Sequence, residues 1–462
     1  MKPIQYFALA GLACLAVFGC KSTDEKLNVN LTAPDWSKQS VIYEVNVRQH
    51  SSEGTFNAVT KDIPRIKELG ADILWIMPIN PIGVKNRKGT LGSYYSVKNY
   101  VTVNPEFGSL ADFKNLVKTA HSMGQKVIID WVANHTAWDH QWITEHPEYY
   151  EKDSSGKIIT QYDWSDVAKL NYKNNDLRKE MIDAMKYWVS ECDIDGFRCD
   201  VAFLVPADFW VQARKELQAI KPVFMLAEME TQKDINPNPK EFFTNAFNAN
   251  YNWSLHGLSA EIAQGKKTIK DLQKHIQETY KETPTDVYRM SFLTNHDENS
   301  WNGTIEEKYG HKWQLFSVLN YTLPQSFPLI YSGEEANNRK RLQFFEKDAI
   351  KWGDTSLYSW YRKMNALKHT QPALANGSYG APTTFIQLNN QEDLTSLLAF
   401  ERTLDGKSVL VVANLSEGTQ SFKSIGNYTP NEKNIYVSSQ YEIKNGEFIL
   451  PSFGFAVFTT QN

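Results

Sequence analysis

The sequence predicts an α/β fold: a (β/α)8 TIM barrel with an insertion domain after its third strand and a C-terminal antiparallel β-sandwich domain. Eight short apolar runs, rich in β-branched residues, recur between residues 41 and 333, and amphipathic helical stretches separate most of them. A long polar and aromatic segment separates the third run from the fourth. From about residue 378 the helical stretches stop and strand-like alternation continues. Eight repeats favour a closed barrel, and the helix-free tail favours a separate β domain.

Residues 1–20 have the pattern of a bacterial lipoprotein signal peptide. Lys2 precedes the apolar run YFALAGLACLAVFG, and VFGC resembles a lipobox that would leave Cys20 as the lipidated first residue of the mature chain. Phe18 departs from the small or aliphatic residue usual there, so an ordinary signal peptide is the alternative. Residues 21–37 are interpreted as a polar tether. We therefore expect a membrane attachment through a lipid anchor in the envelope of a Gram-negative bacterium, at the outer membrane on its periplasmic or surface side.

The barrel elements follow in chain order. The expected strands are the apolar runs at 41–47, 73–79, 126–132, 196–202, 223–228, 247–252, 289–296 and 326–333. Helical periodicity is clear at 59–70, 110–124 and 177–191, and each of these stretches ends near a glycine or a polar break. The predicted domains are the barrel at 38–135 and 181–377, the insertion at 136–180, and the C-terminal domain at 378–462.

Composition excludes some classes of protein. The net charge is −4 and no run of lysine or arginine occurs, which argues against a nucleic-acid partner. Aromatic residues make up 13% of the chain, which fits either a bulky core or a surface that stacks on sugar rings. Cys192 and Cys199 have no zinc-site or disulfide spacing, and we expect both to be buried thiols.

Polar residues gather where the predicted strands end. In barrel enzymes the chemistry lies at the carboxyl ends of the strands, so these side chains are candidate site residues. They are Asp130, Asn134 and His135 at the third strand, Arg198 and Asp200 in the fourth, Glu228 at the fifth, and His296 and Asp297 at the seventh. Any one of them alone would more often be a satisfied buried group.

This set of side chains suits cleavage of a glycosidic bond. A retaining glycosidase needs one carboxylate as nucleophile and one carboxylic acid to protonate the leaving oxygen. Arg198 beside Asp200 is expected to lower the pKa of that carboxyl group and keep it ionised. A third carboxylate and histidines can bind sugar hydroxyls and stabilise the positive charge that develops on the ring.

The motifs resemble those of the α-amylase family of glycoside hydrolases, family 13, from about residue 38 to the end. The matching segments are IIDWVANH, GFRCD, LAEME and FLTNHD, with GSYYSVKNY and PLIYSGEE as two further signatures. The resemblance implies that Asp200 is the nucleophile, Glu228 the general acid/base and Asp297 the transition-state stabiliser. It also implies that Arg198 orients Asp200, that His135 and His296 bind the sugar at the cleavage point, and that Tyr95 stacks on this sugar.

Two departures from the family pattern concern its structural calcium. Where many α-amylases carry a Lys-His pair after the nucleophile, this chain has Phe203 and Leu204, which suggests an apolar acceptor side. In WSDVAKLNY the position of a calcium-binding aspartate holds Lys169, and an ammonium group reverses the local charge. Asn134 alone does not make a site. We therefore expect no metal and no cofactor, with Lys169 in the place of the ion.

The expected function is retaining hydrolysis of α-1,4-glucosidic bonds in starch-type glucans or maltooligosaccharides. An α-glucosidase or glucanotransferase of the same fold, including one acting on α-1,6 bonds, is the first alternative. A non-catalytic glucan-binding protein is the second, although such proteins typically lack one of the three carboxylates. The sequence leaves open whether Trp131, Trp138, Trp142 and Trp164, in or beside the insertion, line the site or pack in the core.

Overall fold

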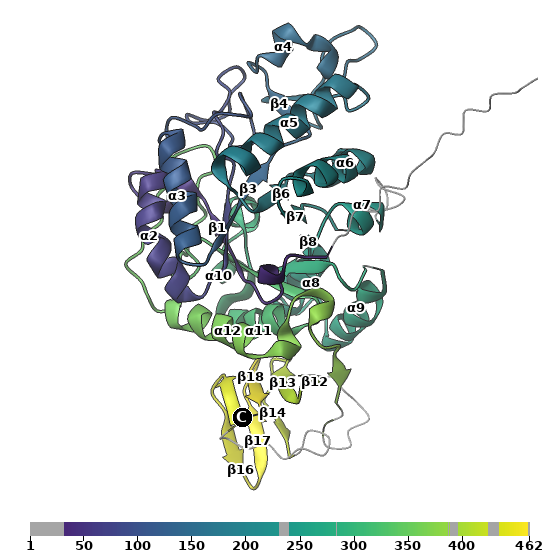
Figure 1. Cartoon of the computed structure of the whole chain (residues 1–462). Helices are drawn as coiled ribbons and strands as arrows, with labels where there is room; N and C mark the ends of the chain where they lie inside the picture. The colour runs from purple at the N-terminus through teal and green to yellow at the C-terminus, as the bar shows by residue number, and fades with distance from the viewer. Residues whose placement is uncertain are drawn as a thin grey trace, which may run out of the picture.

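The computed structural model describes residues 32–230, 240–282, 284–386, 388, 396–423 and 434–460 (Figure 1). The predicted signal peptide, Cys20 and most of the predicted tether lie outside these residues. Within the described part of the chain, no helix is both long and apolar enough to span a membrane.

All eight predicted barrel strands are present, and they close into a parallel barrel. They are β1 (Ile42–Val45), β2 (Ile73–Ile76), β3 (Lys126–Trp131), β6 (Gly196–Cys199), β7 (Phe224–Ala227), β8 (Ala249–Tyr251), β9 (Tyr288–Ser291) and β10 (Ser326–Tyr331). The order around the barrel is β1-β10-β9-β8-β7-β6-β3-β2. Several strands are shorter than the apolar runs that predicted them, because the last residues of those runs turn away from the sheet to form the site described below.

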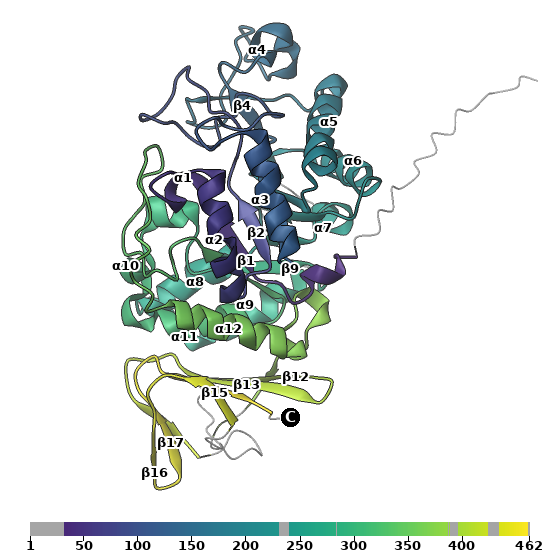
Figure 2. The same ribbon diagram turned by 60° about the vertical axis from the view of Figure 1, so that its left-hand side comes forward.

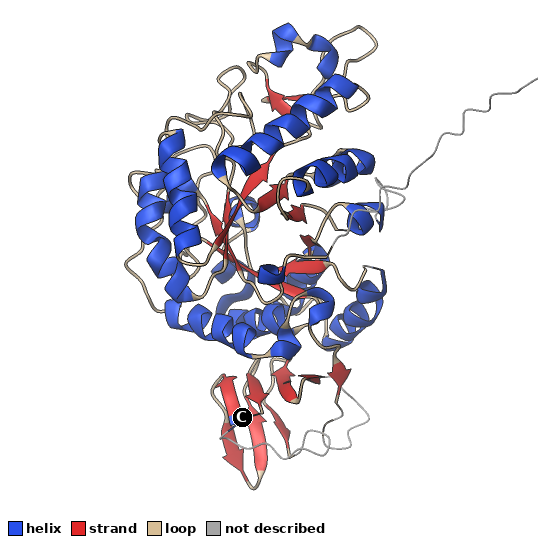
Figure 3. Cartoon of the chain, in the orientation of Figure 1, coloured by secondary structure: helices blue, strands red, loops and turns tan. Residues whose placement is uncertain are grey.

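Helices surround the barrel, as Figure 3 shows. The main ones are α2 (Phe56–Leu69), α3 (Leu110–Ser122), α5 (Asn175–Cys192), α6 (Ala207–Gln218), α8 (Trp253–Ala263), α9 (Ile269–Glu282), α11 (Trp313–Thr322) and α12 (Tyr358–Thr370), with shorter α1 (Val47–His50), α7 (Lys240–Asn245) and α10 (Ile305–Tyr309). Local sequence fixes their ends. Ser109 and Asp112 form a capping box at the start of α3, and Gly70 ends α2 in the left-handed conformation.

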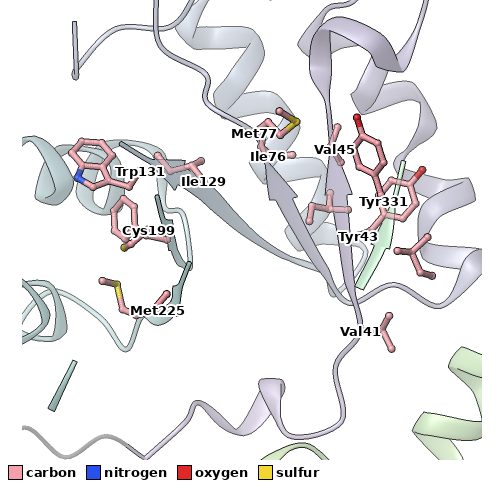
Figure 4. Close-up of a cluster of buried hydrophobic side chains, with 14 of the residues drawn as sticks. Val41, Tyr43, Val45, Ile76, Met77, Ile129, Trp131, Cys199, Met225 and Tyr331 are labelled. Carbon is pink, nitrogen blue, oxygen red and sulfur yellow. The ribbon is translucent and has the colours of Figure 1, made fainter. Parts of the chain in front are cut away.

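Alternation along the strands divides the core into two layers. One set of side chains, which includes Ile42, Trp75 and Phe224, fills the barrel interior. The other set packs between strands and helices; Figure 4 shows Tyr43, Ile129 and other members. The free thiol Cys199 belongs to this outer layer, and Cys192 is also free and buried, as predicted.

The insertion lies at one end of the barrel and the C-terminal domain at the other (Figures 1 and 2). In the insertion, β4 (His135–Ala137) pairs antiparallel with β5 (Val167–Lys169). The short helix α4 (Trp142–Glu145) belongs to the segment of chain that connects these two strands. Its ends differ slightly from the prediction. His135 already belongs to β4, and helix α5 begins at Asn175, because the Asn174 side chain caps it.

Two antiparallel sheets form the C-terminal sandwich. One has the order β11-β12-β13-β18-β15 and the other β14-β17-β16. Their bounds are β11 (Thr384–Phe385), β12 (Leu397–Leu404), β13 (Lys407–Asn414), β14 (Gln420–Phe422), β15 (Ile435–Ser438), β16 (Glu442–Lys444), β17 (Glu447–Leu450) and β18 (Phe455–Thr459). Apolar side chains such as Val412, Phe422 and Phe448 form the core of the domain.

Candidate active site

A cleft opens at the carboxyl ends of the barrel strands, beneath the insertion. Its volume is 460 Å³, within the range of small-molecule sites. Six of the seven sequence-predicted active-site residues meet in or directly beside it, around the seventh, Arg198. The lining residues are Lys88, Ser93, Tyr95, His135, Asp163, Trp164, Asp166, Val167, Asp200, Val201, Glu228, Asp297, Trp301, Phe344 and Phe345.

Arg198 is the centre of this arrangement. It points into the barrel from β6 and is fully buried. Its Nη1 lies 2.9 Å from Asp130 Oδ1 and 2.9 Å from Asp200 Oδ1, and its Nη2 lies 3.0 Å from Glu228 Oε2. A buried charge of this kind is costly unless it is paired, and here three carboxyl groups pair with it. One guanidinium group therefore holds the two predicted reacting carboxyl groups close together.

The pKa of Asp200 differs from the sequence-based expectation. Burial raises it well above its usual value, the nearby Glu228 carboxyl raises it further, and Arg198 only partly opposes this rise. Arg198 lowers the pKa of Asp200, as predicted, but burial and Glu228 outweigh this effect and the net shift is upward. Burial likewise raises the pKa of Glu228, again against the effect of Arg198. Because closely spaced acids cannot all ionise easily in a dry site, the pair favours one ionised and one protonated group.

Val201 orients Glu228 through a strained backbone. This residue has a φ of 36°, which is rare for a β-branched side chain, and its N–H donates to Glu228 Oε2 at 2.7 Å. Such strain costs about 1–3 kcal/mol and is typical of functional sites. Of residues 201–204, it is Val201 that belongs to the cleft lining, whereas the expected apolar contacts were Phe203 and Leu204.

His296 is held as a cation beside Tyr95. Its Nδ1 lies 2.5 Å from Glu44 Oε1, and its Nε2 lies 2.7 Å from the Tyr95 hydroxyl. As a cation, His296 donates to this hydroxyl oxygen, and the hydroxyl in turn donates to Asp130 Oδ2 at 3.1 Å. Burial alone would lower the pKa of His296, but Asp297 and Glu44 outweigh it and raise the pKa to about 9. The predicted sugar-stacking residue Tyr95 is therefore fixed by hydrogen bonds on one side of the cleft.

His135 has the opposite electrostatic character. It lies in β4 of the insertion, and burial lowers its pKa to about 4, so it is neutral at pH 7. Its ring packs edge-on against Trp164, with the ring centres 5.5 Å apart. Trp164 is thus the insertion tryptophan that lines the cleft, whereas Trp131 and Trp142 are buried in the core.

Asp297 precedes a single π-helical turn, Glu298–Asn302, and the first residue of this turn, Glu298, is buried. The Glu298 carboxylate lies 3.1 Å from His256 Nε2, accepts from Asn302 Nδ2 at 2.9 Å, and forms an ion pair with Lys308. Burial alone would raise the pKa of Glu298, but His256 and Lys308 lower it to about 2. A π turn of this kind is frequent at functional sites, and here it fixes the segment that follows Asp297.

Sequence reasoning missed three parts of this site. Glu44 lies in the apolar first strand and was not predicted as a site residue. It is two residues from Ile42 and therefore shares its inward face, which could have indicated a carboxylate inside the barrel. Trp301, in the π-helical turn, and Phe344, after β10, line the cleft but lie in segments without a family motif. Asp130 was noted at its strand end but was given no role, and the structure shows that it binds Arg198, Tyr95 and Trp75.

In the region where the family pattern has a calcium-binding aspartate, Lys169 and Asn134 both contact neighbouring side chains. Lys169 Nζ lies 3.0 Å from Glu151 Oε2, so the lysine ammonium group forms an ion pair with the Glu151 carboxylate. Asn134 Nδ2 lies 3.1 Å from His135 Nδ1. In the described residues no group of three or more acidic, histidine or cysteine side chains could hold a metal ion.

Comparison with known proteins agrees with this geometry. Residues 37–164 and 152–356 match the family model for the α-amylase catalytic domain. Among solved structures, an α-amylase from Lactobacillus plantarum has a TM-score of 0.78 and 31% identity, with 92% of this chain and 100% of that one covered.

Curated relatives cover most of the chain at lower identity. "Alpha-amylase 3" of Dictyoglomus thermophilum is 25% identical over 89% of this chain and 91% of its own length. "Alpha-amylase MalA" of Haloarcula japonica is 25% identical over 83% of this chain, which spans 56% of that relative. Other relatives are named as maltosyltransferases and as a trehalose-6-phosphate hydrolase, so the family alone does not specify one reaction. Because the family model matches more than half of the length of this chain, the chain belongs to the α-amylase family of glycosidases.

Proposed function

We propose that the protein hydrolyses α-1,4-glucosidic bonds in starch-type glucans or maltooligosaccharides, with retention of configuration. The observation that carries the proposal is Arg198, which holds Asp200 and Glu228 on two nitrogens of one guanidinium group inside a sugar-sized cleft. Retaining enzymes need their two carboxyl groups about 5–5.5 Å apart, closer than inverting enzymes do. A shared guanidinium favours that closer spacing.

The proposed reaction has two displacements. Ionised Asp200 attacks the anomeric carbon while protonated Glu228 gives its proton to the leaving oxygen, which forms a covalent glycosyl ester on Asp200. Glu228, now ionised, takes a proton from water as the water oxygen attacks the anomeric carbon, and the bond between that carbon and Asp200 breaks to release the sugar and the free carboxylate. Asp297 and cationic His296 bind hydroxyl groups of the same sugar ring, and Tyr95 packs against its face.

The activity can be tested with soluble starch, pullulan and maltoheptaose. We expect wild type to release reducing sugar from starch and maltoheptaose, and Asp200→Asn to release almost none. Products that retain the α configuration, seen by NMR before mutarotation, would support double displacement. Products longer than the substrate would instead indicate a glucanotransferase, and cleavage of pullulan would indicate α-1,6 activity. Binding of maltoheptaose by wild type without cleavage would favour the glucan-binding alternative.

We further propose that the chain is a lipoprotein of the outer membrane, acylated at Cys20. The proposal rests on the sequence of residues 1–20 and on the polar segment that follows. Cell fractionation tests it: wild type should sediment with membranes and leave them only with detergent. Cys20→Ala should appear in the soluble fraction. Wild type in the soluble fraction would contradict the proposal.

A further inference from the structure

A second cavity lies at the opposite end of the barrel from the cleft that holds Asp200. Its volume is 510 Å³, close to the 460 Å³ of that cleft. Its walls come from three parts of the chain: Ile276 in α9, Pro324 and Gln325 directly before β10, and Phe385 in β11. The barrel and the C-terminal sandwich therefore both contribute to it.

Gln325 brings an unpaired hydrogen-bond acceptor to this cavity. The residue is only 5% exposed, and its Nε2 donates to Pro284 O at 2.9 Å and to Val287 O at 3.3 Å. These bonds fix the amide group, yet its Oε1 is buried and has no hydrogen-bond partner among the residues that the structure describes. A buried polar atom without a partner is costly, so it indicates a group that the protein itself does not supply.

Thr383 presents a second unpaired polar atom to the same cavity. Its Oγ1 is also buried without a hydrogen-bond partner in the described part of the chain. A hydroxyl group can donate one hydrogen bond and accept others, whereas an amide oxygen only accepts. Gln325 and Thr383 together therefore suit a ligand with several hydroxyl groups.

The rest of the cavity wall is apolar or neutral. Ile276, Pro324 and Phe385 contribute apolar surface, and none of the described lining residues carries a charge. A charged ligand would be taken from water without a counter-charge, which is costly. An aromatic ring beside neutral hydrogen-bonding groups suits a sugar, because a sugar has apolar C–H faces and a rim of hydroxyl groups. The cavity therefore favours a neutral carbohydrate over a phosphate or a metal ion.

The walls of the cavity are already fixed in position. Ala381 lines it, and the Ala381 carbonyl accepts a hydrogen bond from Arg402 Nε at 2.8 Å while its N–H donates to Ala373 O at 2.9 Å. Gln325 has a φ of 58°, an uncommon backbone conformation for a residue other than glycine and one that gathers at ligand sites. A cavity that is ordered beforehand loses little entropy when a ligand binds.

We propose that this cavity is a second carbohydrate site, which binds a glucose unit of an α-glucan chain far from the reacting bond. The inference rests on the proposed α-glucan activity and deepens it, because it gives the enzyme a second contact with polymeric substrate. Gln325 precedes β10 at the amino end of the barrel, whereas the cleft lies at the carboxyl ends of the strands. The cavity therefore anchors long chains and takes no part in bond cleavage.

Affinity electrophoresis through gels that contain soluble starch tests the site, in an Asp200→Asn background that does not digest the gel. Thr383→Val keeps the shape of the side chain and removes its hydroxyl group, and Ser378→Trp places a large ring at the exposed rim of the cavity. Each should weaken the Kd for starch about fivefold. Ser190→Trp is the matched control, at an exposed serine of α5 that does not line the cavity, and should bind like Asp200→Asn alone.

The outcomes separate this inference from the function on which it rests. If Thr383→Val and Ser378→Trp bind starch as tightly as Ser190→Trp does, with all three folded by circular dichroism, the second site is overturned and the proposed activity stands. A wild type that cleaves no α-glucan, together with an Asp200→Asn protein that starch does not retard, would overturn both.

Kinetics of the active enzyme give an independent result. Ser378→Trp in the wild-type background should raise KM on starch more than KM on maltoheptaose, because only a long chain can reach from the cleft to the cavity. An equal rise on the two substrates would show that the substitution acts through the cleft, and would overturn the second site.

Discussion

At the scale of single residues, the site is defined by an excess of acids over bases. Glu44, Asp130, Asp200, Glu228 and Asp297 surround two cations, Arg198 and His296. Because burial strengthens repulsion among these acids, the site retains a proton that isolated carboxyl groups would lose. A proton available for the leaving oxygen follows directly from this charge balance.

Glu228→Gln separates the two predicted roles of the carboxyl pair. On starch we expect a loss of about 10²–10⁴ in kcat, because glutamine cannot protonate the leaving oxygen. On α-glucosyl fluoride, whose leaving group needs little protonation, the first step should be far less affected. Asp200→Asn should lose activity on both substrates. Equal losses of Glu228→Gln on starch and on the fluoride would contradict the assignment of Glu228 as the acid.

The pH profile on the fluoride gives a second result for the same pair. In the proposed mechanism Asp200 must be ionised and Glu228 protonated, so Glu228 is neutral at the pH where the acid limb of kcat/KM reports Asp200. Glutamine is neutral as well, and we therefore expect the acid limb of Glu228→Gln to stay in place. The alkaline limb that reports loss of the Glu228 proton should disappear. An acid limb that moves to lower pH would show that Glu228 is ionised in the active enzyme, which would contradict its assignment as the acid.

Glu44→Gln should lower the free energy of unfolding more near pH 6 than near pH 9.5. The folded-state pKa of His296 is about 9, above the usual 6.5, so its contribution to stability is complete below about pH 6.5 and is lost as pH rises through about 9. Without Glu44 we expect the free energy of unfolding to fall by about 1–2 kcal/mol near pH 6, and by less near pH 9.5. Thermal melts at both values measure it. The exposed control Glu68→Gln should show no such difference, and a loss in Glu44→Gln that is the same at both values would contradict the prediction.

At the scale of elements, the β4–β5 hairpin of the insertion carries the lysine that we expect in place of a calcium ion. Lys169, at the end of β5, pairs with Glu151. We expect the same melting temperature with excess EDTA and with added calcium, because an ammonium group repels the ion. The EDTA-treated protein should also keep its activity. A fall of more than about 5 °C on chelation, restored by calcium, would show that the insertion holds a metal.

The elements themselves could be predicted well from sequence, for a physical reason. Each barrel strand is a compact apolar run, and helices such as α3 carry a capping box, so local chemistry marks both. What local chemistry does not mark is where a run leaves the sheet. Residues 292–296 look like strand, yet they leave β9 to carry His296 and Asp297 into the cleft. Tertiary contacts with Glu44 and Tyr95 decide that path.

The positions of the site residues could be predicted from the sequence, whereas properties that depend on their surroundings could not. The approach of Asp200 and Glu228 was expected from strand ends alone, because parallel strands end at one rim. The pKa of Asp200 was not, since it depends on how much water the neighbouring strands exclude. Trp301 was not expected either, because a π turn after Asp297 has no simple sequence signal.

At the scale of the whole molecule, one arginine joins the C-terminal sandwich to the barrel. Arg402 lies in β12, and its side chain is buried at the end of the barrel opposite the cleft. Its Nε donates to Ala381 O at 2.8 Å, and its Nη1 donates to Thr322 O and Leu323 O, each at 2.9 Å, at the carboxyl end of α11. A cation at this position also interacts favourably with the helix dipole.

Arg402→Ala should therefore destabilise the protein without changing the cleft. Three buried carbonyl groups would lose their donor, which predicts a loss of about 2–4 kcal/mol, seen as a lower melting temperature. The exposed Arg339→Ala is the control and should melt like wild type. At temperatures where both variants are folded, kcat and KM on maltoheptaose should match those of wild type, because the sandwich lies across the barrel from Asp200. A variant that melts normally, or that is folded but inactive, would show that the two domains are coupled in some other way.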